Sequence, residues 1–147
     1  SSGDSEKDAK MTVEEREASL VKAAATQSVY NTCHHALINL ARIRKGERVL
    51  IHSAAGGVGH AAISICKYKG AIIYATAGNP EKRQLVRDMG VDFVYDSRST
   101  SWFADLMRDT DQQGVDVVLN SLAGMHQRLG VQALRSSGRF LEIGKVR

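Results

Sequence analysis

The chain has 147 residues, of which 43% are hydrophobic, and its formal net charge is +4. This length suits one domain with a buried core. No apolar run approaches the ~20 residues of a membrane-spanning helix. The basic residues are spread along the chain, and no Lys/Arg block indicates nucleic-acid binding. The two cysteines are too few and too isolated for a disulfide framework, which favours a reducing, cytoplasmic setting.

The N-terminal region divides into a polar lead and a long helical pattern. Residues 1–10 are polar and have no signal-peptide core, so we expect a disordered lead or a remnant added for expression, followed by one domain over residues 11–147. Thr12 and Glu15 have the spacing of a capping box. A helical pattern then runs over residues 18–43 and ends at Lys45-Gly46. Its apolar positions are spaced to line one face: Leu20, Val21, Ala24, Val29, Ala36, Leu37, Leu40 and Ala41.

A regular alternation of strands and helices follows. The predicted strands are Arg48–His52, Ala71–Thr76, Phe93–Tyr95, Val115–Leu119 and Phe140–Ile143. The predicted helices are Gly57–Lys69, Pro80–Met89, Ser101–Arg108 and Gly124–Leu134. Such alternation implies right-handed crossovers and a parallel sheet. Strands that are almost continuously apolar are typical of a sheet covered on both sides. The predicted fold is therefore α/β, a Rossmann-type doubly wound parallel sheet with helices on both faces.

A glycine-rich turn joins the first strand of this alternation to the first helix. Ala54 stands at the first glycine position of a G-x-G-x-x-G pattern, and Gly56 and Gly59 fill the second and third. Backbone N–H groups at such a turn, together with the positive end of the helix, hold a pyrophosphate. An ordinary strand-to-helix turn is the alternative. The residues predicted to contact the cofactor here are Ala55, Gly56, Gly57, Val58 and Gly59.

The end of the second strand indicates which dinucleotide is bound. Domains that prefer NAD usually carry Asp or Glu there, which accepts a hydrogen bond from the ribose 2′-hydroxyl, and this chain has none. Nearby cations attract a 2′-phosphate instead, so NADPH is favoured over NADH. Lys82 is preferred to Arg83 as the contact, although a solvated helix face is the alternative for both. The residues expected in this pocket are Thr76, Gly78, Asn79, Lys82 and Arg98.

Other reactive side chains do not form a recognisable site. Cys33, His34 and His35 are adjacent, but neighbouring helix residues point in different directions and no second cluster supplies further zinc ligands, so we expect no metal. His52 is interpreted as a packed or hydrogen-bonded core histidine, and Cys66 as a small core hydrophobe. Nucleophilic hydrolysis has no support, because no G-x-S-x-G or Ser-His-Asp arrangement is visible.

Several segments together resemble a known family. They are residues 52–59 (HSAAGGVG), 76–78 (TAG), 81–83 (EKR), 97–98 (SR), 115–124 (VDVVLNSLAG) and 138–145 (GRFLEIGK). From about residue 18 onward the chain is similar to the enoyl reductase domains of modular polyketide synthases and animal-type fatty acid synthases. These domains form a zinc-free branch of the medium-chain dehydrogenase/reductase superfamily, beside the quinone oxidoreductases.

The resemblance implies an activity and further site residues. Such reductases use NADPH to saturate an α,β-unsaturated acyl thioester on an acyl carrier protein, and the cofactor supplies the hydride. Lys145 matches a lysine proposed as proton donor, with an orienting role as the alternative. Asn120, Ser121 and Gly144 are expected at the carboxyl ends of strands, where open α/β sheets bind ligands. Thr32 matches a threonine near the nicotinamide.

The resemblance also sets expectations for the whole molecule. The family's substrate domain is absent from this chain, so we expect an excised cofactor domain that binds NADPH but reduces enoyl thioesters poorly or not at all. Implied partners are the other domains of a synthase and a second copy, through the sheet edge at Phe140–Ile143; neither nucleic acid nor membrane is expected. Two alternatives stay open: a quinone oxidoreductase cofactor domain, and a non-catalytic structural domain within a synthase.

Overall fold

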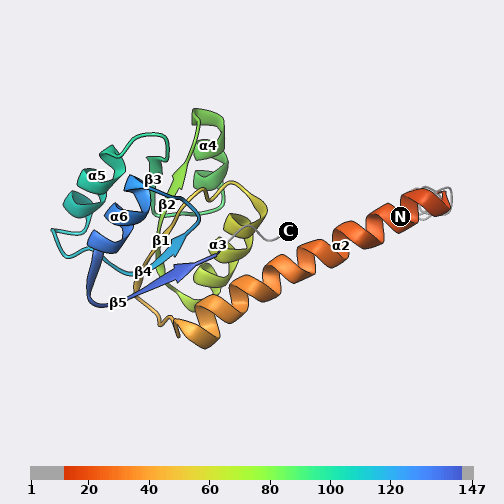
Figure 1. Ribbon diagram of the computed structural model, residues 1–147, viewed down its shortest axis with the longest axis horizontal. Coiled ribbons are helices and arrows are strands. Elements are labelled where there is room, and N and C mark those ends of the chain that lie inside the picture. The colour runs from red at the N-terminus through yellow and green to blue at the C-terminus, as the bar shows by residue number, and fades with distance from the viewer. Residues whose placement is uncertain (1–11, 144–147) are drawn as a thin grey trace.

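The computed structural model describes residues 12–143, apart from the side chains of residues 16–26. A parallel five-stranded sheet with the order β3-β2-β1-β4-β5 forms its centre (Figure 1). The strands are β1 Arg48–Ile51, β2 Ile72–Ala77, β3 Phe93–Asp96, β4 Val115–Asn120 and β5 Leu134–Glu142. The predicted parallel α/β sheet is confirmed. The predicted lead at residues 1–10, with Gly144 and Lys145, lies outside the described residues.

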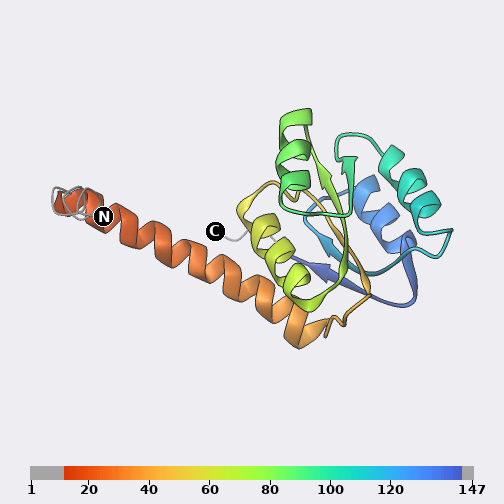
Figure 2. The same cartoon turned by 180° about the vertical axis from the view of Figure 1, so that it is seen from behind.

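Helices cover both faces of this sheet. They are α2 Val13–His34, α3 Gly57–Lys69, α4 Pro80–Asp88, α5 Ser101–Asp109 and α6 Met125–Gln132. The chain winds from β1 through α3 and α4 along one face, and then through α5 and α6 along the other (Figures 1 and 2). This arrangement is the doubly wound topology, in which ligands bind at the carboxyl ends of the strands.

The middle strand β1 shows how the sequence builds two apolar layers. Successive side chains of a strand point to opposite faces. Val49 and Ile51 belong to the core cluster under α2, α3 and α4, whereas Leu50 belongs to the cluster under α5 and α6. All three side chains are at most 1% exposed. Because both faces of the strand are buried here, the residues from Val49 to Ile51 are continuously apolar rather than alternating.

The first helix begins at the predicted cap and ends in an irregular turn. Thr12 Oγ1 accepts a hydrogen bond from the Glu15 backbone N–H at 3.1 Å, and the Glu15 carboxylate accepts from the Thr12 N–H at 3.2 Å. The predicted capping box is therefore confirmed. Beyond α2 the chain continues into a π-helical turn, η1, at His35–Leu40, and Arg42 has a positive φ of 52°. The C-terminal part of α2 packs on α3, while the N-terminal part projects beyond the sheet (Figures 1 and 2).

Two predicted boundaries are wrong. The helix expected over residues 18–43 is regular only to His34, and the side-chain face expected for its first half lies outside the described side chains. The last strand, expected at Phe140–Ile143, begins at Leu134. Its first part is Arg-Ser-Ser-Gly at the sheet edge, where residues 135–137 are exposed. A strand segment that buries nothing has no hydrophobic pattern by which it could be predicted.

Candidate functional site

The glycine turn lies between β1 and α3, at the carboxyl end of the sheet. Its reversal uses a positive φ of 52° at Ser53, one residue before Ala54. Ala54 is outside the positive-φ region and donates its backbone N–H to Thr76 O at 2.8 Å. An alanine therefore replaces the first glycine of the pattern without backbone strain, because the left-handed residue is its neighbour.

The two following glycine positions have different structural reasons. A Cβ atom on Gly59 would overlap the backbone of Ala54, so only glycine lets α3 approach the turn this closely. A Cβ on Gly56 would meet only Ser53 O, at 3.9 Å, and one on Gly57 would meet nothing within 4 Å. No side chain caps α3. No side-chain acceptor therefore occupies its first N–H groups, and the helix dipole favours negative charge there.

Buried polar side chains hold the turn in place. Thr76 is fully buried, and its Oγ1 accepts from the Ser53 backbone N–H at 3.1 Å and lies 3.1 Å from His52 Nδ1. His52 is 3% exposed, and its ring packs edge-on against Trp102 with centroids 4.8 Å apart. Burial, with a smaller contribution from His126, lowers the pKa of His52 to about 4. The histidine is therefore a neutral core residue, as the sequence predicts, and Thr76 uses its hydroxyl within the fold.

A pocket of about 350 Å³ lies beside the turn. It is formed where the carboxyl ends of β1, β2 and β3 meet the start of α4. Of the described residues that line it, two are cationic and none is acidic. This composition suits a phosphate group. The lining residues are Ser53, Ala55, Gly56, Ala77, Gly78, Lys82, Ser97 and Arg98.

The structure brings five predicted site residues together in this pocket: Ala55, Gly56, Gly78, Lys82 and Arg98. Ser97 was not among the predicted contacts, although it precedes Arg98. The signal that could have found it is the end of β3, since the carboxyl ends of neighbouring parallel strands meet at one edge.

Asn79 has a structural task next to the pocket. Its side-chain oxygen accepts the Lys82 backbone N–H at 2.8 Å, which makes Asn79 the N-cap of α4 with Pro80 in the first turn. Asn79 is not among the lining residues, whereas Lys82 is. The cap fixes where α4 begins and therefore where the backbone of Lys82 lies relative to the pocket.

Another group of polar residues lies at the ends of β4 and β5. Asn120 is fully buried, and its amide donates to Leu122 O at 2.7 Å and to the two Glu142 carboxylate oxygens at 2.9 and 3.2 Å. Ser121 is exposed and donates to His52 O at 3.3 Å. These contacts order the loop after β4 next to the glycine turn. Gly144 and Lys145 would follow β5 but lie outside the described residues.

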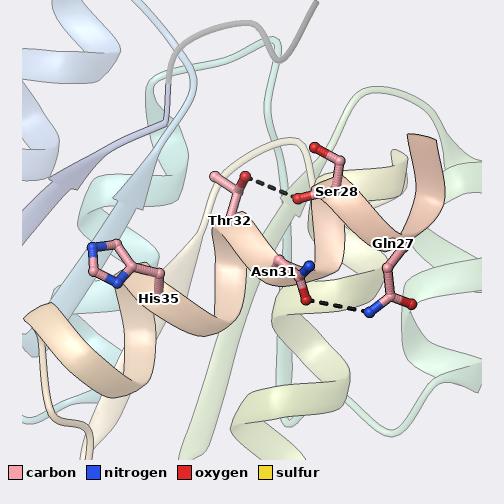
Figure 3. Close-up of a pocket in the computed structure, with 5 residues that line it drawn as sticks. All are labelled: Gln27, Ser28, Asn31, Thr32 and His35. Carbon is pink, nitrogen blue, oxygen red and sulfur yellow. Dashed lines mark hydrogen bonds between the residues drawn. The ribbon is translucent and has the colours of Figure 1, made fainter. Parts of the chain in front are cut away.

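Thr32 lies on α2, away from the basic pocket. With Gln27, Ser28, Asn31 and His35 it lines an open depression of about 590 Å³ (Figure 3). Its hydroxyl donates to Ser28 O at 2.9 Å within the helix. The following residue, Cys33, contacts Val58 O at 3.5 Å and so joins this part of α2 to the first turn of α3. Val58, Gly57 and Gly59 form that turn and do not line the basic pocket.

Comparison with known proteins decides the family. The model of the zinc-binding dehydrogenase family matches residues 57–147. The nucleotide-binding subdomain of the enoylreductase domain of PpsC from Mycobacterium tuberculosis is 52% identical, with a TM-score of 0.79, over 82% of this chain and 67% of that one. The chain belongs to the zinc-binding dehydrogenase family. Within it, the chain belongs with the enoyl reductase domains of polyketide synthases, which confirms the resemblance found in the sequence.

Two further relatives show how much of a synthase the chain represents. The CurK enoyl reductase is 44% identical with a TM-score of 0.77, over 80% of this chain and 35% of that one. A mycocerosic acid synthase-like polyketide synthase of Mycobacterium tuberculosis is 53% identical over 124 residues, which is 84% of this chain. The chain spans 6% of the length of that curated relative.

The family name refers to zinc, but the described part of the chain does not fit a zinc ion. Residues 12–143 contain no group of three or more His, Cys, Asp or Glu side chains placed to hold a metal. Cys33 is buried, His34 packs beside Tyr30 with ring centroids 6.2 Å apart, and His35 Nδ1 lies 3.2 Å from the Asn39 amide. The three adjacent side chains thus have separate surroundings and do not form a ligand set.

None of the helices in the described residues is long and apolar enough to cross a bilayer.

Proposed function

We propose that the chain is the NADPH-binding part of an enoyl reductase in a polyketide synthase. The observation that carries this proposal is the basic pocket, where Lys82 and Arg98 line the carboxyl ends of the strands without an acidic neighbour in the lining. An NAD-selective domain places a carboxylate on the ribose 2′-hydroxyl. A pocket with two cations instead favours the 2′-phosphate, which is present only in NADP(H).

Each part of the site has a proposed role. Lys82, Arg98 and Ser97 hold the 2′-phosphate, with Gly78 allowing close approach. The N–H groups of the first turn of α3, at Gly57, Val58 and Gly59, bind the pyrophosphate together with the Ala55–Gly56 backbone. Thr76 and Asn79 position this end of the site through the hydrogen bonds described above.

The nicotinamide end is proposed to lie at the loops after β4 and β5. Asn120 orders the first loop and Ser121 is exposed on it. Gly144 and Lys145 follow β5 in the sequence, and Thr32 on α2 is proposed as a further contact with the nicotinamide end. When bound, NADPH supplies the hydride that saturates the double bond. Lys145 is proposed to donate the proton or to stabilise the developing enolate charge.

The substrate and partners follow from the relatives and belong to this proposal. The substrate class is an α,β-unsaturated acyl thioester on an acyl carrier protein, and the other partners are domains of the same synthase. The edge of β5 around residues 140–143 is the proposed contact with a second copy, since it is the last strand in the sheet order. A cytoplasmic location is proposed because Cys33 and Cys66 are both free thiols.

Calorimetric titration with NADPH and NADH tests the proposal. We expect NADPH to bind at least about tenfold more tightly, equivalent to about 1.4 kcal/mol. Lys82→Ala should remove most of this preference, whereas Lys45→Ala, at the opposite end of β1, should keep it. Equal binding of both cofactors would contradict the 2′-phosphate assignment. Binding of neither would contradict the proposed cofactor role of this chain.

A further inference from the structure

An acidic residue lies next to the lining of the basic pocket. Asp96 ends β3, and its Oδ1 accepts the backbone N–H of Arg98 at 2.9 Å. The neighbouring residues Ser97 and Arg98 both line the pocket, and Gly78 across from them lies close to the same two side chains. The Asp96 side chain is 43% exposed. Its negative charge therefore lies close to the place where a phosphate would bind.

This charge has one cationic partner among the described residues. Arg83 Nη1 lies 3.5 Å from Asp96 Oδ1 and also donates to the carbonyl of Ala77 at 3.3 Å. The Arg83 side chain is 20% exposed. Arg83 is not among the lining residues, whereas its neighbour Lys82 is. The two adjacent cations at the start of α4 therefore point to different places.

We propose that Arg83 determines cofactor specificity indirectly, by neutralising Asp96 rather than by contacting the phosphate. The inference rests on the proposed function and assigns a positioning role within it. An unpaired carboxylate next to the pocket would repel a 2′-phosphate carrying nearly two negative charges, but would leave a 2′-hydroxyl almost unaffected. With Arg83 in place, Asp96 keeps its hydrogen bond to the Arg98 backbone without adding a repulsive charge.

A double-mutant cycle in the 147-residue chain tests this role. Arg83→Gln should lower the ratio of NADPH to NADH affinity by about three- to tenfold, because Asp96 is then unpaired. Asp96→Asn, whose amide oxygen can still accept the Arg98 N–H, should keep or raise the ratio. The double variant should return to within about twofold of the unmodified chain, since neither charge remains. This non-additivity is the readout that a merely structural residue would not produce.

Two further variants and the salt concentration control the experiment. Arg83→Lys keeps the positive charge and should keep the ratio of NADPH to NADH affinity. Arg87→Gln removes an exposed cation one turn further along α4 and should leave that ratio unchanged. The effect of Arg83→Gln should shrink as salt rises from about 0.05 to about 0.5 M, because exposed charges are screened over about 10 Å at 0.1 M. The ratio of two ligands compares folded molecules only, so a loss of stability does not imitate the effect.

The outcomes separate this inference from the proposed function. Arg83→Gln is compared in two backgrounds, with Asp96 and with Asn at that position. If it lowers the ratio of NADPH to NADH affinity equally in both, Arg83 contacts the phosphate itself and the inference is overturned. An unchanged ratio in Arg83→Gln also overturns it, while Lys82→Ala would still report on the pocket. If the unmodified chain shows no preference for NADPH, the proposed function fails and the inference fails with it.

Discussion

Thr76 illustrates how a polar residue at a strand end can serve the fold. From the sequence it is predicted to contact the cofactor, because it is polar and ends the second strand. In the structure it has no exposed surface, and its hydroxyl serves the Ser53 N–H and the His52 ring. Sequence position places a residue at the right edge of the sheet, but the direction of the side chain depends on packing around it.

His52 gives a prediction about stability and pH. Its pKa is about 4 in the folded chain, against the ordinary value of 6.5, because burial disfavours the charged ring. The unfolded chain takes up a proton as the pH falls through 6.5, whereas the folded chain does not until about 4. Stability from this residue is therefore complete well above pH 6.5 and decreases toward pH 4.

Between about pH 7.5 and about pH 5 we expect His52 to account for about 2 kcal/mol of lost unfolding free energy. Urea denaturation of the chain and of His52→Gln at both pH values measures this contribution. The variant is expected to be less stable at the higher pH, because Gln does not restore the packing against Trp102, but to lose less stability on acidification. An identical pH slope in both proteins would mean that folding does not lower the pKa of His52.

Gly59 gives a prediction about steric fit. Because a Cβ there would overlap the Ala54 backbone, Gly59→Ala should push α3 from the turn and lower the free energy of unfolding by about 1–3 kcal/mol. Gly57→Ala is the matched control, since its Cβ would meet nothing within 4 Å. It should change stability by less than about 1 kcal/mol. Chemical denaturation compares the two, and equal losses would contradict the steric explanation.

Among the helices and strands, bounds marked by a clear apolar or glycine pattern could be predicted from the sequence, whereas those in exposed or irregular segments could not. The helix at Gly57–Lys69 has its predicted bounds, because its start follows a glycine turn and its end is marked by Gly70 with a φ of 75°. The beginning of β5 could not be predicted, because its exposed polar residues at the sheet edge have no alternation. The π-helical turn also escaped prediction, since its residues continue an ordinary helical pattern.

Arg139 links three elements that are far apart in the sequence. From β5 its guanidinium donates to both Glu47 carboxylate oxygens, at 2.8 and 2.9 Å, and to Ala41 O at 3.0 Å after η1. The hydrogen bond from Arg139 is the main reason that the pKa of Glu47 is lowered. A bidentate pair of this geometry is a strong charge-assisted interaction, and it ties the edge strand to the segment before β1.

Arg139→Ala should lower the unfolding free energy by about 1–3 kcal/mol, because it leaves the half-buried Glu47 carboxylate and the Ala41 carbonyl without this partner. Arg135→Ala is a control on the same strand, since its contact with Asp116 is longer at 3.4 Å and its side chain is 45% exposed. It should cost less than about 1 kcal/mol. In a cycle with Glu47→Ala, additive effects would show that the pair contributes no coupling energy.

For the whole molecule, the sheet order explains why distant sequence motifs form one site. The turn after β1, the end of β2 and the Ser97-Arg98 pair after β3 lie at one edge because all three strands are parallel and adjacent. Sequence reasoning could therefore predict most of the pocket's members from topology alone. The sequence also favours Lys82 over Arg83 as the pocket cation, and Lys82 is the one of the two in the lining. The Arg83–Asp96 pair could not be predicted, because the direction of a helical side chain relative to β3 depends on where the cap at Asn79 starts α4.

The share of a reductase that the chain spans leads us to expect slow reduction of an enoyl thioester by the chain alone. The described residues offer a basic pocket and the strand ends, but the chain corresponds to 35% of the CurK enoyl reductase chain. Correct orientation of a substrate against a cofactor contributes a large part of catalysis, and a small misplacement costs about a hundredfold. We therefore expect the chain to bind NADPH yet to reduce a crotonyl thioester at least about a hundredfold more slowly than a reductase of full length.

Oxidation of NADPH, followed by its absorbance with a crotonyl thioester in excess, measures this rate, and a full-length enoyl reductase domain serves as the positive control. A robust rate in the chain alone would contradict the prediction, because it would mean that these residues orient the acyl group unaided. A quinone in place of the thioester completes the test. Rapid oxidation with the quinone alone would favour the quinone oxidoreductase alternative, because the acceptor would then be chosen by residues within this chain.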